Sequence, residues 1–299
     1  MQPLLALCLI AKNEEAAILC TLESFAAACD LAVVVDTGST DRTREIVRGF
    51  APRDGFAVCL TSSKWVDYAT ARNAALDEHA LIATRAKWTI SASVDEVVGG
   101  DIQSARAFLA EYDGPEEALL VEVRTAEGTF PFPRALRTGS AWRFEGEVHE
   151  QPIYATDREK QASVQIPGIW IEHSATDRER RARRLRDLDL PALTHAVHTW
   201  RDNPAERSRM AILLASTHEY IAAEASAGGD VHESSAHQFA ALGWFAVVAH
   251  DDAAPAEARQ RATWKYLNVA EPIGVYLPHE TVARLRPVCE TTSDPAPHF

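Results

Sequence analysis

Acidic side chains follow two apolar segments of the chain, at positions where a divalent cation could bind. Asp36 ends the run LAVVVD, and Asp95 and Glu96 follow the segment WTISASV. If both segments are strands of one parallel sheet, their carboxyl ends meet at the edge where open α/β sheets bind ligands. Carboxylate oxygens there suit Mg²⁺ or Mn²⁺ bridging a diphosphate. The competing interpretation is that Asp95 and Glu96 cap the next helix or lie in a solvated loop.

Four further side chains could bind phosphate or metal, or move a proton. Arg72, in YATARNAAL, could offer a bidentate fork to phosphate, or it could be an ordinary surface arginine. In WRFEGEVHEQP, His149 could bind metal or phosphate and Glu150 could act as a general base on an acceptor hydroxyl. On a strand these two neighbours would point to opposite faces. His173 closes the strand-like segment GIWIEH, where a lone histidine is more often structural.

Charge is distributed unevenly along the chain. The formal net charge is −13, so the surface as a whole should repel nucleic acid and anionic membranes. Residues 178–186, RERRARRLR, nevertheless carry six arginines in nine positions. We favour a solvated helix face for this run, and the alternative is a surface that binds phosphate groups near the site.

Strand and helix patterns alternate in the first half of the chain, as in α/β proteins. We expect strands at residues 4–10, 31–35, 56–60 and 87–92, and helices starting at Asn13 and covering 41–50 and 69–85. Residues 118–124 and 129–148 resemble antiparallel strands with Gly/Pro turns, and residues 164–172 resemble one more strand. Helices are expected over 210–225, 234–250 and 256–270. The fold class predicted is therefore α/β with a mixed sheet over residues 1–180, followed by an all-α module over 181–299.

Cysteine usage and hydropathy indicate a reduced, cytoplasmic protein. The five cysteines form no CxxC pair, so we expect neither a disulfide framework nor a zinc site. The apolar run near the N-terminus is short, lacks a basic flank, and is followed by KNEE, so we expect a buried strand there instead of a secretion signal. No segment approaches the roughly 18 uncharged apolar residues of a membrane span.

Five segments in a fixed order carry a resemblance to a known family. They are CLIAKNEE (8–15), VVVDTGSTDRT (33–43), ARNAAL (71–76), WTISASVDE (88–96) and GEVHEQP (146–152), with EH (172–173) as a weaker sixth. Together they resemble the family 2 glycosyltransferases, which are inverting enzymes of the GT-A fold. The most similar members are bacterial ones whose catalytic domain precedes tetratricopeptide-like helices.

The resemblance implies a role for each matching residue. The positions implied to bind the nucleotide-sugar donor are Lys12, Asn13, Glu14, Asp36, Gly38, Ser39, Asp41, Arg72, Ser93 and Val94. Asp95 would be the last acid of the metal-binding DxD motif, with a further metal contact from His149 or His173. Glu150 is implied as the base that activates the acceptor, with Glu147 as the alternative.

One position departs from the family pattern. Similar sequences have Asp-Ala-Asp-Glu where this chain has Ser93, Val94, Asp95 and Glu96. Asp95 can still hold Mg²⁺ or Mn²⁺ together with phosphates and water. The loss of one carboxylate should weaken metal affinity or change how the donor is held.

The expected activity is transfer of a sugar from a nucleoside-diphosphate sugar, most often UDP-linked, to an acceptor hydroxyl with inversion. The acceptor stays open between a glycan, a peptide or protein, and a modified nucleic-acid base, the last with residues 178–186 contacting the nucleic-acid backbone. A different class of function is also compatible with Ser93. The chain would then be a catalytically impaired binding or scaffold protein, whose helices hold a partner.

Overall fold

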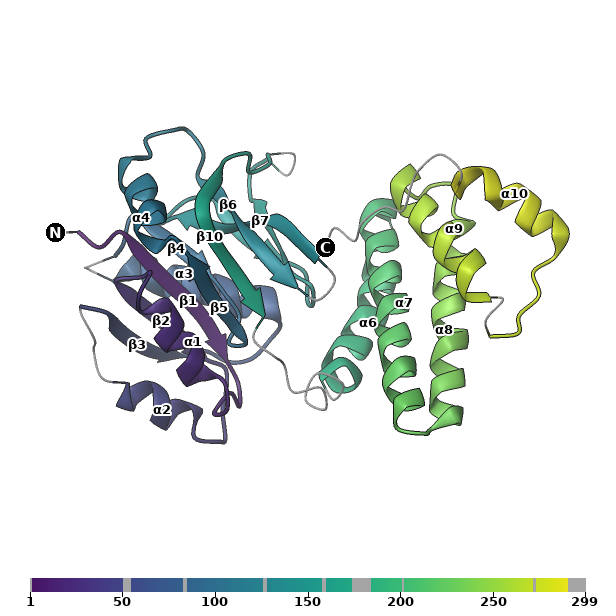
Figure 1. Cartoon of the computed structure of the whole chain (residues 1–299), viewed down its shortest axis with the longest axis horizontal. Coiled ribbons are helices and arrows are strands. Elements are labelled where there is room, and N and C mark those ends of the chain that lie inside the picture. The colour runs from purple at the N-terminus through teal and green to yellow at the C-terminus, as the bar shows by residue number, and fades with distance from the viewer. Residues whose placement is uncertain are drawn as a thin grey trace. The chain divides into compact units, whose positions relative to one another are not determined.

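The computed structural model describes residues 2–50, 55–82, 85–125, 128–157, 160–173, 184–200, 202–270 and 273–289. The chain divides into two compact units, Met1–Thr176 and Asp177–Pro297, and each is described by itself (Figure 1). The boundary predicted at residues 180 and 181 lies outside the described residues.

The first unit alternates strands and helices and then turns to antiparallel strands. Its elements are β1 (Leu5–Ala11), α1 (Ile18–Phe25), β2 (Leu31–Asp36), α2 (Thr43–Gly49), β3 (Ala57–Ser62), α3 (Tyr68–Leu81), β4 (Trp88–Ser91), β5 (Glu96–Gly100), α4 (Ile102–Glu111), β6 (Ala118–Thr125), β7 (Gly128–Arg137), β8 (Trp142–Glu145), β9 (Gln151–Tyr154) and β10 (Gln165–His173). Eight strands form one sheet in the order β3-β2-β1-β4-β7-β6-β10-β5, and β8 pairs with β9 alone.

The sheet is mixed, as predicted. β1 is parallel to β2 and β4, and β2 is parallel to β3. β7 then runs antiparallel to β4, and β5 runs antiparallel to β10. The predicted fold class, an α/β unit followed by an all-α unit, is confirmed, and the parallel half places the ends of β1 to β4 at one edge.

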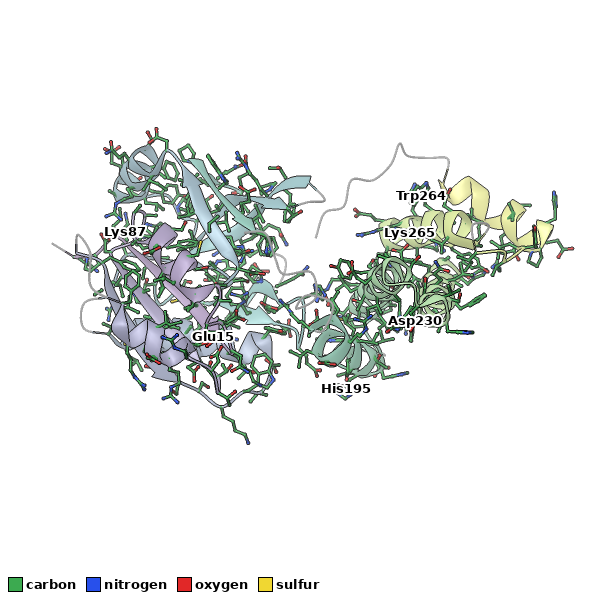
Figure 2. All side chains as sticks on the ribbon, turned by 60° about the horizontal axis from the view of Figure 1, so that its bottom comes forward. Glu15, Lys87, His195, Asp230, Trp264 and Lys265 are labelled. Carbon is green, nitrogen blue, oxygen red and sulfur yellow. The ribbon has the colours of Figure 1, made fainter. Side chains whose placement is uncertain are left out.

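Alternate residues of the central strands supply two separate cores. On one face, Leu7 of β1 and Val34 of β2 pack with α1 and α4. On the other face, Cys8 and Val33 pack with α3 through Ala75. Because strands covered on both faces bury every side chain, they read as unbroken apolar runs in the sequence. Lys87, labelled in Figure 2, donates to the carbonyls that end α4, with 2.9 Å from its Nζ to the oxygen of Tyr112.

The second unit is helical in its described part. Its elements are a π-helical turn (Leu185–Asp189), α6 (Leu190–Thr199), α7 (Pro204–Ala227), α8 (Val231–Ala249), α9 (Ala256–Ala270) and α10 (His279–Cys289). Successive helices pack against one another. Lys265 of α9, labelled in Figure 2, forms an ion pair with Glu219 of α7 at 2.9 Å. Within the described residues, no helix has both the length and the apolar character that a membrane crossing requires. That these helices form tetratricopeptide repeats stays a prediction.

Several expected elements differ from those observed. The first helix begins at Ile18 and not at Asn13, because Asn13 adopts a left-handed backbone (φ +58°) and uses its side chain elsewhere. The third helix ends at Leu81, short of residue 85. The strands with turns expected over 129–148 are β7 and β8, with a turn at residues 138–139 between them, and β8 ends at Glu145, before residue 148. Five observed elements were not predicted from the sequence: β5, α4, β9, α6 and α10.

Candidate active site

Asp36 lies where the first three strands end side by side. Ala11, Asp36 and Ser62 are partners in the sheet register. The Asp36 side chain is 1% exposed and accepts hydrogen bonds from the backbone amides of Gly38 (3.3 Å) and Ser39 (3.2 Å). Gly38 has φ +110°, a conformation that other residues rarely adopt, so this tight turn requires glycine. The predicted edge position of Asp36 is therefore observed, with its carboxylate closing the turn.

Hydrogen bonds join the loop after β1 to the loop after β2. The Asn13 side chain accepts from the amide of Thr40 at 2.8 Å, and the Asn13 amide donates to the hydroxyl of Ser39 at 3.0 Å. The Glu14 amide donates to Thr43, whose own amide donates to Asp41. The structure thus brings together most of the residues of these two loops that the resemblance implied for donor binding.

Lys12 meets an aromatic residue that the sequence analysis missed. Its ammonium lies 5.4 Å from the ring centre of Trp65, in the segment after β3. Trp65 also packs edge-on against Tyr68, with 5.0 Å between ring centres. Lys12 is exposed and Trp65 is half-buried, so both are accessible at this edge. The feature of the sequence that could have indicated Trp65 is its position, three residues after the end of β3.

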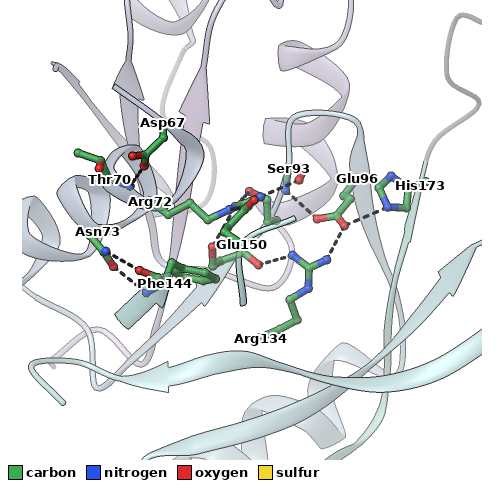
Figure 3. A network of polar contacts seen from close by, with 12 residues as sticks. Asp67, Thr70, Arg72, Asn73, Ser93, Glu96, Arg134, Phe144, Glu150 and His173 are labelled. Atoms are coloured by element: carbon green, nitrogen blue, oxygen red, sulfur yellow. Dashed lines mark hydrogen bonds and ion pairs between the residues drawn. The ribbon is translucent and has the colours of Figure 1, made fainter. Parts of the chain in front are cut away.

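Arg72 is buried and uses four of its five N–H donors within the protein (Figure 3). Its Nε donates to the Glu150 carboxylate. Its Nη1 donates to the Ser91 hydroxyl (3.1 Å) and the Ala92 carbonyl (3.0 Å), and its Nη2 donates to the Ser93 hydroxyl (3.0 Å). The interpretation of Arg72 as a surface arginine is therefore wrong.

His149 and Glu150 lie in a turn between β8 and β9 and not on a strand. His149 is exposed and has φ +49°, so the alternation of side chains along a strand does not apply. Helix α3 holds this region in place. The side-chain amide of Asn73 exchanges two hydrogen bonds of 2.9 Å with the backbone of Phe144, and the Tyr68 amide donates to the carbonyl of Glu147.

Glu96 is the most buried acid of the site. Its carboxylate is 0% exposed, accepts from the Ser93 amide at 2.7 Å, and pairs with Arg134 at 2.8 Å (Figure 3). Glu96 begins β5, and the residue that caps α4 is Asp101, which accepts from the Ser104 amide. The two competing interpretations of Glu96, as a helix cap and as part of a solvated loop, are therefore wrong.

His173 joins the two acids that follow β4. Its Nδ1 lies 3.6 Å from Asp95, and its Nε2 lies 3.5 Å from Glu96. The hydrogen bond to Asp95 raises the pKa of His173, against the opposing effect of burial, and the charge of Glu96 raises it further. Val94, which directly precedes Asp95, is buried, and its carbonyl accepts from Thr21 of α1.

The described residues contain no group of three or more histidine, cysteine or acidic side chains that could hold a metal ion by themselves. Asp95, one-quarter exposed, and His173 are the accessible pair of donor atoms at this edge. A carboxylate and an imidazole are ligands that Mn²⁺ accepts, and a carboxylate alone suits Mg²⁺. The donor set therefore fits an ion that takes its other ligands from a diphosphate and water.

Most of the arginine-rich run lies outside the described residues, which resume at Arg184. Arg186 forms a two-point ion pair with Glu233 of α8, at 3.0 and 3.1 Å. Arg184 lies 3.6 Å from the buried Asp189. These two arginines thus form ion pairs within the helical unit.

The first part of the chain is similar to a known protein family. Residues 6–80 match the model of glycosyl transferase family 2. These residues, here called the family 2 segment, are therefore similar to part of a family 2 glycosyltransferase. The family 2 segment contains Lys12, Asp36 and Arg72, whereas Asp95, Glu150 and His173 lie beyond it. The expected resemblance to this family is confirmed over residues 6–80.

Solved structures resemble the chain only distantly. S. aureus TarS 1–349 in complex with UDP is 15% identical with a TM-score of 0.47, covering 94% of this chain and 91% of that one. A longer S. aureus TarS structure is 14% identical with a TM-score of 0.44, covering 90% of this chain and 54% of that one. No curated protein matches the chain significantly in sequence.

Proposed function

We propose that the chain transfers a sugar from a nucleoside-diphosphate sugar to an acceptor hydroxyl, with inversion at the anomeric carbon. The observation that carries the proposal is the meeting of three strand-end loops and an acidic turn at one sheet edge, within and just beyond the family 2 segment. Sheet edges of this kind are where α/β proteins bind nucleotides.

The donor lies over the loops that follow β1, β2 and β3. Trp65 offers a ring face for the base, and Lys12 beside it offers a cation for the phosphates. Asp36 keeps the turn of Gly38 and Ser39 closed, so the backbone of that turn is fixed before the donor arrives. A UDP-linked donor is the first to test.

Asp95 and His173 would hold a Mn²⁺ or Mg²⁺ ion against the diphosphate. When bound, such an ion stabilises negative charge on the departing diphosphate. Glu96 orients this part of the site, because it contacts His173, Arg134 and the Ser93 amide at once. The acceptor hydroxyl gives its proton to a carboxylate of the turn at residues 146–150, Glu147 or Glu150.

A donor screen tests the proposal without knowledge of the acceptor. UDP-, GDP- and dTDP-sugars are incubated with the protein and Mn²⁺, and release of the nucleoside diphosphate is measured with and without EDTA. Slow hydrolysis of one donor, together with binding of its nucleotide in calorimetry, is the expected result. Nucleotide binding without any turnover would favour the binding-protein alternative, and no binding of any nucleotide would contradict the proposal.

A further inference from the structure

The guanidinium of Arg72 connects two segments of the chain, the turn that carries Glu150 and the segment that follows β4. Glu150, in the turn before β9, contacts Nε, while Ser91, Ala92 and Ser93, after β4, contact the two terminal nitrogens. The Arg72 and Glu150 side chains are 9% and 11% exposed. The two segments are far apart in sequence, and Arg72 holds them at a fixed separation.

Arg72 and Glu150 form an ion pair that is largely buried. A buried cation without an anion beside it is strongly destabilising. The acceptors at Ser91, Ala92 and Ser93 are neutral, so Glu150 brings the negative charge that contacts this guanidinium. Ser93 contacts a different nitrogen of the same guanidinium, with 3.0 Å from its hydroxyl to Nη2.

The turn that Arg72 holds is the one that carries Asp95. The Ser93 hydroxyl accepts from Arg72, and the Ser93 amide donates to Glu96 at 2.7 Å. Glu96 in turn contacts His173, which lies 3.6 Å from Asp95. Figure 3 shows this chain of contacts from Arg72 to His173. A shift of Arg72 would therefore move the carboxylate proposed to meet the donor.

We propose that Glu150 is a positioning residue for the donor side of the site. Its carboxylate neutralises the positive charge of Arg72. It thereby supplies the negative charge that the neutral Ser93, which contacts the same guanidinium at Nη2, cannot supply. This role rests on the proposed function, and it leaves Glu147 as the carboxylate of the turn to accept the acceptor proton.

The role predicts that a carboxylate at position 93 can replace the one at position 150. The variants are Glu150→Gln, Ser93→Asp and the double variant. Glu150→Gln keeps the side chain's size and removes its charge. The matched control is Glu122→Gln, which breaks the half-exposed ion pair with Arg124 on the sheet.

Two readouts are measured on the full chain. Thermal unfolding reports the buried charge pair whether or not a donor has been found. Glu150→Gln should lower the melting temperature by about 6 °C or more, and adding Ser93→Asp should recover at least half of this loss. In the presence of Glu150, Ser93→Asp alone should lower the melting temperature, because it sets a second carboxylate beside Glu96. The control should shift by less than about 2 °C.

The second readout is donor affinity and donor hydrolysis. Glu150→Gln should weaken both about 10- to 100-fold, as supporting contacts of metal sites do, and the double variant should recover about tenfold. If Glu150→Gln abolishes turnover with unchanged donor affinity and melting temperature, and Ser93→Asp restores nothing, Glu150 is the base and the proposal is wrong. If no donor binds any variant, the proposed function fails, and the melting temperatures alone support or overturn the charge replacement.

Discussion

Arg134 on β7 and Glu96 at the start of β5 form an ion pair, with 2.8 Å between Nη2 and Oε1. The strands that carry them are not neighbours, because β6 and β10 lie between β7 and β5 in the sheet. The two side chains are 13% and 0% exposed, so the pair is withdrawn from solvent. The ion pair with Arg134 of β7 thus holds the buried Glu96 carboxylate in place.

Replacing Arg134 by methionine should destabilise the first unit. Glu96 would be left buried without its main cation, a change that typically costs about 3–5 kcal/mol. His173, at 3.5 Å from Glu96, can offset part of the loss, so we expect the lower end of this range. Urea unfolding measures the effect. Arg124→Met, which removes the half-exposed partner of Glu122, is the control and should cost less than about 1 kcal/mol.

Asp95→Ala should abolish donor hydrolysis while the protein stays folded, because the side chain is partly exposed and proposed to meet the metal–diphosphate. Circular dichroism checks the fold, and activity is titrated with Mn²⁺. Asp101→Asn, which alters an exposed helix cap nearby in sequence, should keep full activity. An Asp95→Ala variant that is fully active in the presence of EDTA would refute the assigned metal role.

Trp65→Ala should weaken nucleotide binding by about 10- to 100-fold, since stacking of a base on an aromatic ring contributes about 1–3 kcal/mol. Trp65→Phe should retain most of the affinity. Calorimetry with UDP, GDP and dTDP measures both variants. Trp264→Ala changes an exposed tryptophan of the helical unit and should leave affinity unchanged. Equal affinities of Trp65→Ala and the unmodified protein would place the base elsewhere.

His79 should make the first unit less stable in acid. Burial lowers the pKa of His79 from 6.5 to about 4, and the charge of Arg85 adds to this shift. Its Nε2 accepts from the Ala86 amide at 3.1 Å, so protonation would break that hydrogen bond. The unfolded chain binds the proton first as the pH falls.

The contribution of His79 to stability is therefore complete above about pH 6.5 and is lost progressively down to about pH 4, by about 3 kcal/mol. Urea unfolding between pH 7 and 4.5 measures this slope. His79→Gln should flatten it, whereas His232→Gln, at an exposed position, should not. An unchanged slope in His79→Gln would assign the acid sensitivity to other groups.

The parallel half of the sheet could be predicted from the sequence because its strands are buried on both faces. The run over β2 is fully apolar up to Asp36, and the strand end placed Asp36 at the site edge. By contrast, β5 reads EVVGG and lacks a strand pattern. Its glycines make room for Trp170, whose ring lies 2.7 Å from where a Cβ on Gly99 would stand. The need for glycine there is visible only when β10 is in place.

The contacts within the site could be predicted less well than its position. Arg72 and Glu150 are 78 residues apart, and their contact depends on how α3 packs against the turn after β8. No local pattern encodes that distance. The resemblance named both residues but assigned each a separate task, whereas the structure joins them.

The position of β5 at the edge of the sheet has a consequence for biosynthesis. Among the described strands, β5 pairs with β10 alone, and Glu96 is paired in register with His173. A nascent chain that has emerged as far as residue 164 holds all four parallel strands, yet the acidic turn has no partner strand to order it. Long-range pairings of this kind form late. We therefore expect the part of the site around Asp95 and His173 to be completed late in the folding of the first unit, after the loops that follow β1, β2 and β3.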